Sequence, residues 1–168
     1  MEVILREGQK SDMESVLNLI KELAVFEKEA NEVELTKEEL ELHGFNANPS
    51  FQVFLAEFNG EVVGMALFYQ RFSTWKGKSI HLEDLIVKKE HRNKGIGRAL
   101  YYKVLSYAEE KKYKRVSWEV LDWNQVAIDF YESTGAKILE GWQVVHMSEA
   151  PLKAYVRKNK ESYFNNNN

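Results

Sequence analysis

The feature that most constrains this 168-residue chain is a short charged loop between an apolar segment and an amphipathic one. Residues 79–87 are rich in β-branched and apolar side chains, which predicts a strand. From Gly95 onward apolar residues recur at helical spacing, which predicts a helix. The loop between them ends in Arg92-Asn93-Lys94-Gly95-Ile96-Gly97. Glycines allow a ligand to approach the backbone closely, and the free N–H groups at a helix start attract anions.

The loop has the pattern R-x-x-G-x-G, which is neither the P-loop pattern nor the longer dinucleotide-binding pattern. Two interpretations fit this spacing. One is a helix start after a tight turn. The other is a cradle for a pyrophosphate, to which Arg92 and Lys94 add positive charge. The loop alone does not distinguish these two interpretations, so evidence from the rest of the chain is needed.

Composition excludes several classes of protein. The chain is 44% hydrophobic and 29% charged, which is ordinary for one soluble globular domain. A formal charge of −3 supplies no basic field for nucleic acid or an anionic membrane. The absence of cysteine excludes disulfides, thiolate metal sites and a cysteine nucleophile, and the four histidines lack metal-ligand spacing. No apolar run reaches the ~20 residues of a membrane span. We expect a cytoplasmic protein with no metal, no nucleic-acid partner and no membrane partner.

The order of expected elements predicts the fold class. Capping signals at Ser11-Asp12-Met13-Glu14 and at Thr36-Lys37-Glu38-Glu39 begin two helices, the first ending near residues 26–28 and the second at His43-Gly44. Further helices are expected from residue 95 and over 124–133, and strands over 3–6, 51–58, 61–71, 79–87, 115–121 and 143–147. This order predicts an α/β (α+β) fold with one central sheet flanked by helices. We expect residues 1–164 to form one domain and residues 165–168 a disordered tail.

Two acidic residues interrupt the apolar strand that precedes the loop. Alternation places Glu83, Leu85 and Val87 on one face of that strand and Asp84 on the other. The pair is either two exposed strand charges or a group that handles a substrate. A thioester lying beside this strand could direct its carbonyl at a backbone N–H near Leu85, an oxyanion-type contact.

Residues around the following helix have two interpretations each. Asn124 is either the N-cap of that helix or a ligand contact. Tyr131 is either core packing or a proton donor to a departing thiolate. Glu22, Glu27 and three further acids near the end of the first helix are either a solvated face or an acidic mouth for a cation. His81 fits a structural role.

These residues together resemble the GNAT superfamily of N-acetyltransferases, in its diamine (spermidine/spermine) and thialysine acetyltransferase branch. The resemblance covers almost the whole chain, with motifs at residues 19–24, 82–84, 92–97, 123–124, 130–131 and 140–142. Residues 73–77 and 120–125 resemble the thialysine type more. The polyamine type usually carries an Asp where Ser73 stands, and that acid helps to hold the second amine. Many relatives have Gly where this loop has Asn93.

The resemblance implies a GNAT fold with a mixed, mostly antiparallel sheet, and acetyl-CoA as co-substrate. It implies acetyl transfer to a primary amine of a small cationic substrate by direct attack in a ternary complex. Tyr131 would be the general acid, and Glu83 would act as base through water or hold the amine. Residues expected at the cofactor are Leu85, Ile86, Val87, Arg92, Asn93, Lys94, Gly95, Ile96, Gly97, Arg98, Asn124, Ala127 and Tyr131. Residues expected at the amine are Phe26, Glu27, Glu83, Trp118 and Glu119.

The resemblance also implies a homodimer, with residues 142–155 near the partner contact. Two other functions stay open at this point. One is a non-catalytic CoA-binding regulatory module on the same fold, and the other is acetylation of proteins or peptides.

Overall fold

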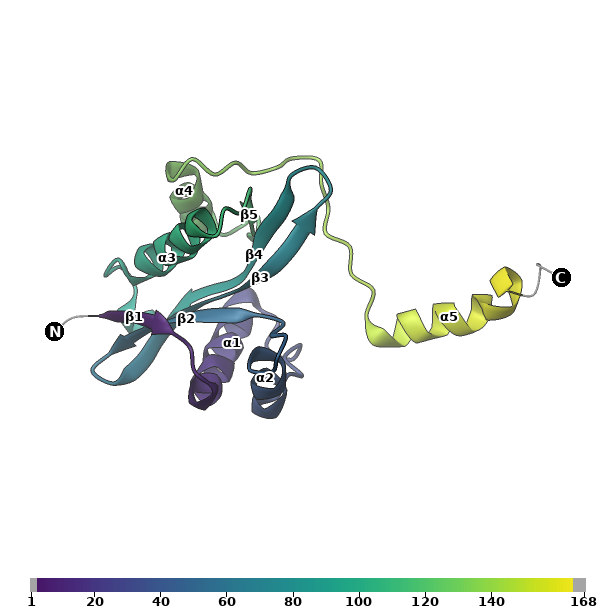
Figure 1. The fold of residues 1–168 in the computed structure, drawn as a ribbon, viewed down its shortest axis with the longest axis horizontal. Helices are drawn as coiled ribbons and strands as arrows, with labels where there is room; N and C mark the ends of the chain where they lie inside the picture. Colours follow the sequence, from purple (N-terminus) through teal and green to yellow (C-terminus); the bar gives the residue numbers. More distant parts are fainter. Residues whose placement is uncertain (1–2, 165–168) are drawn as a thin grey trace. The chain divides into compact units, whose positions relative to one another are not determined.

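The computed structural model describes residues 3–164 (Figure 1). The expected tail at residues 165–168 lies outside this range. The chain divides after Trp123 into two units, which we describe separately. The helices are η1 (Lys10–Asp12), α1 (Met13–Glu27), α2 (Lys37–Gly44), η2 (Lys89–His91), α3 (Ile96–Glu110), α4 (Gln125–Ser133) and α5 (Glu149–Phe164). The strands are β1 (Ile4–Glu7), β2 (Gln52–Phe58), β3 (Glu61–Ser73), β4 (Gly77–Val87) and β5 (Val116–Ser117).

The first unit is built on one five-stranded sheet with the order β1-β2-β3-β4-β5. Neighbouring strands are antiparallel from β1 to β4, while β5 pairs with β4 in parallel. Helices α1 and α2 lie on one face of the sheet and α3 on the other (Figure 1). The mixed, mostly antiparallel sheet flanked by helices is therefore confirmed.

Each face of the sheet carries its own apolar core. On the face of α1 and α2, the buried residues are Met13, Val16, Leu17, Leu19, Leu40, Val53, Leu55, Val62, Met65, Leu67 and Ile86. On the α3 face, the rings of Phe54 and Phe68 lie 5.0 Å apart and Tyr107 lies 5.3 Å from Phe68. Burying one such large apolar side chain contributes about 1.5–3 kcal/mol, so the two cores hold the sheet between its helices.

The helix starts follow the expected capping chemistry at one position and depart from it at another. At α2 the Glu39 N–H donates to Thr36 Oγ1 at 3.2 Å and the Thr36 N–H donates to Glu39 Oε2 at 2.9 Å, a capping box as predicted. The box predicted at Ser11 is wrong. Asp12 instead accepts the Gln9 N–H at 2.7 Å and pairs with Arg6 at 2.7 Å. These contacts tie Asp12 to Arg6 of β1 and to Gln9. The chain therefore forms the turn η1 before α1 begins at Met13.

Two predicted strands differ in the structure. The strand expected over 115–121 is reduced to Val116–Ser117, because only these residues pair with β4. The strand expected over 143–147 is absent from the described structure. Its backbone has no strand partner there and Val144 and Val145 are exposed, so no ladder stabilises it.

The second unit contains α4 and α5. Helix α4 agrees with the expected 124–133, with Asn124 as its N-cap. Helix α5 was not predicted. Its apolar residues Leu152, Tyr155 and Val156 follow one another at three- and four-residue spacing, a signal that indicates a helix.

Candidate active site

A bulge in β4 gives this strand its distinctive geometry. The register with β3 shifts between Leu67, which faces Asp84, and Phe68, which faces Leu82. Glu83 is therefore an extra residue without a partner in the ladder. A bulge bends the strand and re-aims side chains, and it commonly occurs beside functional sites.

The bulge overturns the expected alternation of side chains. Glu83 and Asp84 both line one cavity on the α1 and α2 face, together with Leu67. The prediction that Asp84 lies on the opposite face from Glu83 is therefore wrong, because an extra residue interrupts the two-residue period of the strand. On the α3 face, the side chain of Val87 lies beside Gly64 and Gly97, so the prediction that Val87 shares a face with Glu83 is also wrong.

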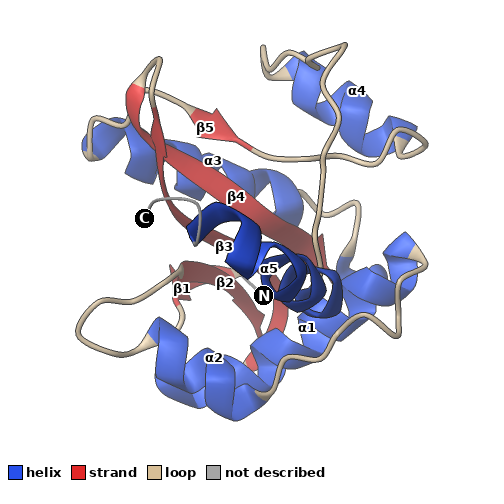
Figure 2. Cartoon of the chain, turned by 90° about the vertical axis from the view of Figure 1, so that its right-hand side faces the viewer, coloured by secondary structure: helices blue, strands red, loops and turns tan. Residues whose placement is uncertain are grey.

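The edge of β4 that faces β5 has no strand partner on the C-terminal side of the bulge. On the N-terminal side of the bulge, the Ile80 N–H donates to Arg115 O at 2.9 Å, so β4 and β5 are joined there. Their pairing ends at His81. Figure 2 shows β5 as a short strand beside the much longer β4. Beyond the bulge, the Lys88 N–H donates to Val63 O on the β3 side. By alternation, the backbone groups of Leu85 and Val87 point to the open edge.

The predicted phosphate loop has the backbone of an anion site. Asn93 has φ 61° and Gly95 has φ 79°, and Gly95 is the N-cap of α3. The first intrahelical bond runs from the Ala99 N–H to Gly95 O, so the N–H groups of Ile96 and Gly97 have no partner within the helix. This arrangement at the start of a 15-residue helix suits a phosphate group.

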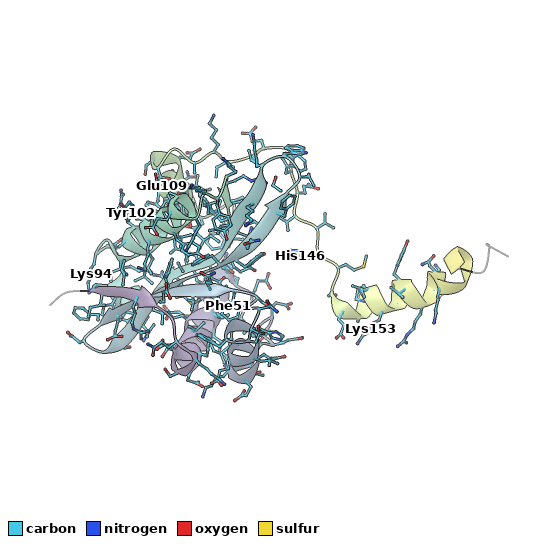
Figure 3. The ribbon with its side chains drawn as sticks, in the orientation of Figure 1. Phe51, Lys94, Tyr102, Glu109, His146 and Lys153 are labelled. Carbon is cyan, nitrogen blue, oxygen red and sulfur yellow. The ribbon has the colours of Figure 1, made fainter. Side chains whose placement is uncertain are left out.

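Both cationic side chains of the loop make contacts within the protein. Arg92 Nε donates to Val87 O at 2.9 Å, and its guanidinium lies 3.9 Å from Glu22 and 5.4 Å from the ring centroid of Phe26. Lys94, labelled in Figure 3, donates from Nζ to Glu90 O at 3.0 Å. Arg92 thus ties the loop to β4 and α1, and the backbone amides are the groups best placed for an anion.

Two residues lie beside the half-exposed Glu83 carboxylate. His81 Nε2 lies 3.5 Å from Glu83 Oε2, and His81 is buried. Burial raises the pKa of Tyr69, as do the charge of Glu83 and the hydrogen bond between their side chains. Glu119 contributes to the same shift, so the predicted residues Glu83 and Glu119 both act on the Tyr69 hydroxyl.

Asp84 is the member of the predicted acidic pair to which the sequence assigned no role of its own. Burial raises its pKa from 3.8 to about 7, and the charges of Glu83 and Glu27 add to the shift. Burial, and the charge of Glu29, likewise raise the pKa of Glu27. The charges of two predicted residues, Glu27 and Glu83, therefore both act on the Asp84 carboxyl group. An acidic residue with a pKa near 7 beside a cavity is a common feature of functional sites.

The cavity has a volume of about 380 Å³, in the range of small-molecule sites. Its walls come from β3, β4, α1, α2 and the segments before α2 and β2. The lining residues are Ile20, Leu35, Glu39, Leu40, His43, Phe51, Leu67, Glu83 and Asp84. Phe51, labelled in Figure 3, also packs against the core of the α1 and α2 face. The cavity thus combines an apolar lining with a few charged groups.

Other residues that were predicted to border the amine substrate lie elsewhere in the first unit. The ring of Phe26 lies 5.5 Å from that of Trp123, which also has Lys28 Nζ 4.9 Å from its centroid. Trp118 packs edge-on against Tyr101 of α3 at 5.5 Å. Neither Phe26 nor Trp118 lines the cavity.

The remaining predicted residues belong to the second unit. The Asn124 side chain accepts the Ala127 N–H at 3.3 Å, which confirms its N-cap interpretation. Tyr131 is buried on α4, with its ring 5.3 Å from Phe130. Over residues 3–164, no three His, Cys, Asp or Glu side chains gather as a metal site, and no helix is long and apolar enough to cross a membrane.

A bulged strand with an open edge, a glycine loop at a helix start and an acidic cavity define an acyltransferase-like site. Residues 14–136 match the acetyltransferase (GNAT) family, and the chain belongs to that family. It is thus an enzyme of the transferase class.

The chain is also similar in sequence or in structure to individual proteins. The chain is 40% identical over 151 residues to a thialysine N-epsilon-acetyltransferase of Bos taurus, covering 83% of this chain and 89% of the relative. It is 32% identical over 158 residues to a spermidine/spermine N(1)-acetyltransferase-like protein 1 of Homo sapiens, covering 88% of this chain and 23% of the relative. An integron cassette protein from Vibrio cholerae shares the fold, with a TM-score of 0.76, 21% identity and coverage of 94% of this chain and 99% of that one.

Proposed function

We propose that this protein transfers the acetyl group of acetyl-CoA to a primary amine of a small cationic acceptor, by direct attack in a ternary complex. The bulge in β4 is the observation that carries the proposal. It brings Glu83 and Asp84 to one cavity, beside the stretch of β4 at Leu85 and Val87 that β5 leaves unpaired.

The open edge and the loop fit acetyl-CoA. The backbone from Leu85 to Val87 would bond the acetyl and pantetheine parts, and an N–H near Leu85 would stabilise the developing alkoxide. The amides from Arg92 to Arg98 would hold the pyrophosphate, because that loop presents helix-start N–H groups. Asn124 and Ala127 would line the pantetheine arm. Acetyl-CoA supplies the activated acyl group, and the protein supplies position and proton transfer.

The amine must lose a proton before it attacks. An amine with a pKa of about 10.4 is neutral in about one molecule in 2,500 at pH 7, which costs roughly 4.6 kcal/mol. Glu83, beside Tyr69 and His81, would bind the ammonium or accept its proton through water. Glu27 adds negative potential near the same place, because its charge helps to raise the pKa of Asp84. Tyr131 would protonate the departing thiolate, whose pKa as a free thiol is about 8.5.

The named relatives support a thialysine-like or lysine-like amine as the acceptor. Ser73, which stands where the polyamine type has Asp, accepts the Trp75 and Lys76 N–H groups at 3.3 and 3.2 Å. Its hydroxyl shapes the turn and carries no charge for a second amine.

A panel of acceptors in one CoA-release assay tests the proposal. Thialysine, lysine, putrescine, spermidine and short peptides are each supplied with acetyl-CoA, and free CoA and acetylated product are measured. We expect release with thialysine and lysine above the rate without amine. Binding of acetyl-CoA without release for any amine would show a regulatory CoA-binding module, and release only with peptides would show a protein acetyltransferase.

We also propose a homodimer through residues 142–155, where Trp142, Val144, Val145 and Met147 expose apolar surface. Sedimentation of the full chain should give twice the monomer mass, and Val145→Glu should shift it toward the monomer. A monomer at all concentrations would contradict this proposal.

A further inference from the structure

We propose that His81 is the residue that positions the Glu83 carboxylate for the acceptor amine, and that it acts as a neutral imidazole with its proton on Nε2. This inference rests on the proposed acetyl transfer, in which Glu83 binds the ammonium or takes its proton. Two features of β4 carry it. His81 has a buried nitrogen without a partner, and Glu83 lies at the bulge.

The backbone of His81 is fixed by the sheet on both sides, whereas that of Glu83 is not. His81 pairs with Tyr69 of β3 on one side and with Ser117 of β5 on the other. Glu83 is the extra residue of the bulge, and its side chain is 50% exposed. A long side chain in this situation has several orientations open to it, so contacts from neighbouring side chains have to select one.

Tyr69 and His81 offer such contacts from two strands. Their ring centroids lie 5.2 Å apart. The Tyr69 hydroxyl is hydrogen-bonded to the Glu83 side chain, and His81 Nε2 lies 3.5 Å from Glu83 Oε2. The second distance exceeds the roughly 2.7–3.2 Å of a formed hydrogen bond, and catalytic contacts of this length commonly shorten when the substrate binds. The other charges that act on the Tyr69 hydroxyl are those of Arg71 and Glu119.

The second ring nitrogen of His81 decides which protonation state fits. Within the described range 3–164, Nδ1 is buried and has no hydrogen-bond partner. A proton on Nδ1, in the other neutral tautomer or in the imidazolium, would leave a buried N–H group without an acceptor. A proton on Nε2 instead points toward a carboxylate and leaves only a lone pair on Nδ1. The surroundings therefore favour the Nε2–H tautomer.

A neutral donor suits the proposed role of Glu83. An imidazolium would form an ion pair with Glu83 and compete with the acceptor ammonium for the same carboxylate. A neutral N–H group orients the carboxylate and leaves its negative charge available to the ammonium or its proton. A purely structural role, which the sequence favoured for His81, gives no reason for the unpaired Nδ1, because an apolar ring would fill the position without that cost.

Two substitutions separate the hydrogen-bond donor from the ring. His81→Phe keeps a ring beside Tyr69 and removes both nitrogens, whereas His81→Gln places an amide N–H group near the position of Nε2. His91→Gln is the control for the loss of a histidine, because His91 packs against the ring of Phe58 and does not line the cavity. Each variant is assayed with lysine for kcat/KM, for acetyl-CoA binding and for thermal unfolding.

We expect His81→Phe to lower kcat/KM for the amine by about ten- to a hundredfold, as the loss of a hydrogen bond to a charged group does. His81→Gln should recover most of that loss, and acetyl-CoA binding should not change in either variant. His81→Phe should unfold at the wild-type temperature or above it, because it removes an unpaired buried nitrogen. An unchanged kcat/KM in His81→Phe, with the wild type active, would overturn the role of His81 and leave the acetyl transfer standing.

A double-mutant cycle tests whether His81 acts through Glu83. In the Glu83→Gln background, His81→Phe should change kcat/KM little, because the carboxylate that it positions is gone. The same loss in both backgrounds would show that the two residues act independently, and it would overturn the proposal.

The tautomer is measured by 15N NMR on the full chain labelled at histidine, without substrate. The His81 signals are those that disappear in His81→Phe. At pH 7 we expect a protonated Nε2 and an unprotonated Nδ1, and a proton on Nδ1 would overturn the proposal. A wild type that acetylates no amine would instead remove the proposed function, and with it the role of His81, whichever tautomer the spectrum shows.

Discussion

Glu83 and Asp84 are consecutive residues of one strand, yet both side chains line the same cavity. In a regular strand they would point to opposite faces. The bulge at Glu83 of β4, opposite Leu67 and Phe68 of β3, removes that alternation. Two acids at one cavity then differ in environment, because Glu83 lies beside Tyr69 and His81 while Asp84 is buried. Burial raises the pKa of Asp84 to about 7, and the charge of Glu83 adds to that shift.

Glu83→Gln should lower kcat/KM for the amine by about a hundredfold or more, because proton transfer by a placed group contributes that much. Dissociation constants for acetyl-CoA, measured by calorimetry, should stay close to the wild-type value. Glu110→Gln, an exposed acid of α3, is the control for the charge change. A full rate across the pH range in Glu83→Gln would remove Glu83 from the mechanism.

Asp84→Asn should change how stability depends on pH. The pKa of Asp84 is about 7 in the folded protein against 3.8 ordinarily, so between these values the folded state holds a proton that the unfolded chain has lost. This group therefore makes stability fall as pH rises through that window, with the full cost present above about pH 7. Asp84→Asn should be more stable than the wild type at pH 8, by up to about 4 kcal/mol, and similar to it near pH 4.

Urea unfolding of both proteins at pH 4, 6 and 8 measures this difference. The same difference at all three pH values would mean that Asp84 does not hold the extra proton.

Gly95→Ala and Gly97→Ala test two different effects of an added side chain in the loop. The first is the free-energy cost of a left-handed backbone, and the second is contact of the new Cβ with its surroundings. Gly95 has φ 79° and open space around it, so alanine there should cost about 1–2 kcal/mol through its backbone alone. A Cβ at Gly97 would meet Val87 Cγ2 at 3.7 Å, an ordinary contact on the protein side. Gly97→Ala should therefore fold as well as the wild type but bind acetyl-CoA more weakly, because the added Cβ stands on the loop proposed to hold the pyrophosphate. Thermal unfolding and CoA titration check both variants, and equal losses in the two would contradict this account.

Tyr131→Phe should lower kcat more than it weakens acetyl-CoA binding. The change removes only the hydroxyl and keeps the ring that packs beside Phe130 on α4. Because the hydroxyl is the proposed proton donor to the thiolate, its loss should appear in turnover. Steady-state kinetics with CoA release measure this, and Tyr102→Phe on the exposed surface of α3 is the control. Unchanged turnover would discard the assignment.

Local signals in the sequence predicted most individual elements. The Thr36 cap, the Asn124 cap and the glycines at the start of α3 all involve residues within a few positions of one another, so their chemistry is visible in the sequence. The sequence did not predict the extra turn at Asp12. Its cause is the ion pair of Asp12 with Arg6 on β1, and Arg6 is itself held by an ion pair with Glu57 on the neighbouring strand β2.

The sequence by itself determined the order of strands and helices, the glycine loop at a helix start and the family to which the chain belongs. Only the tertiary structure decided where β4 bulges, which edge of it opens and that Asp84 joins Glu83 at one cavity with Glu39. A bulge depends on the register between two strands, and burial depends on which helix covers the strand. Both are relations between distant segments, and no local pattern of residues encodes them.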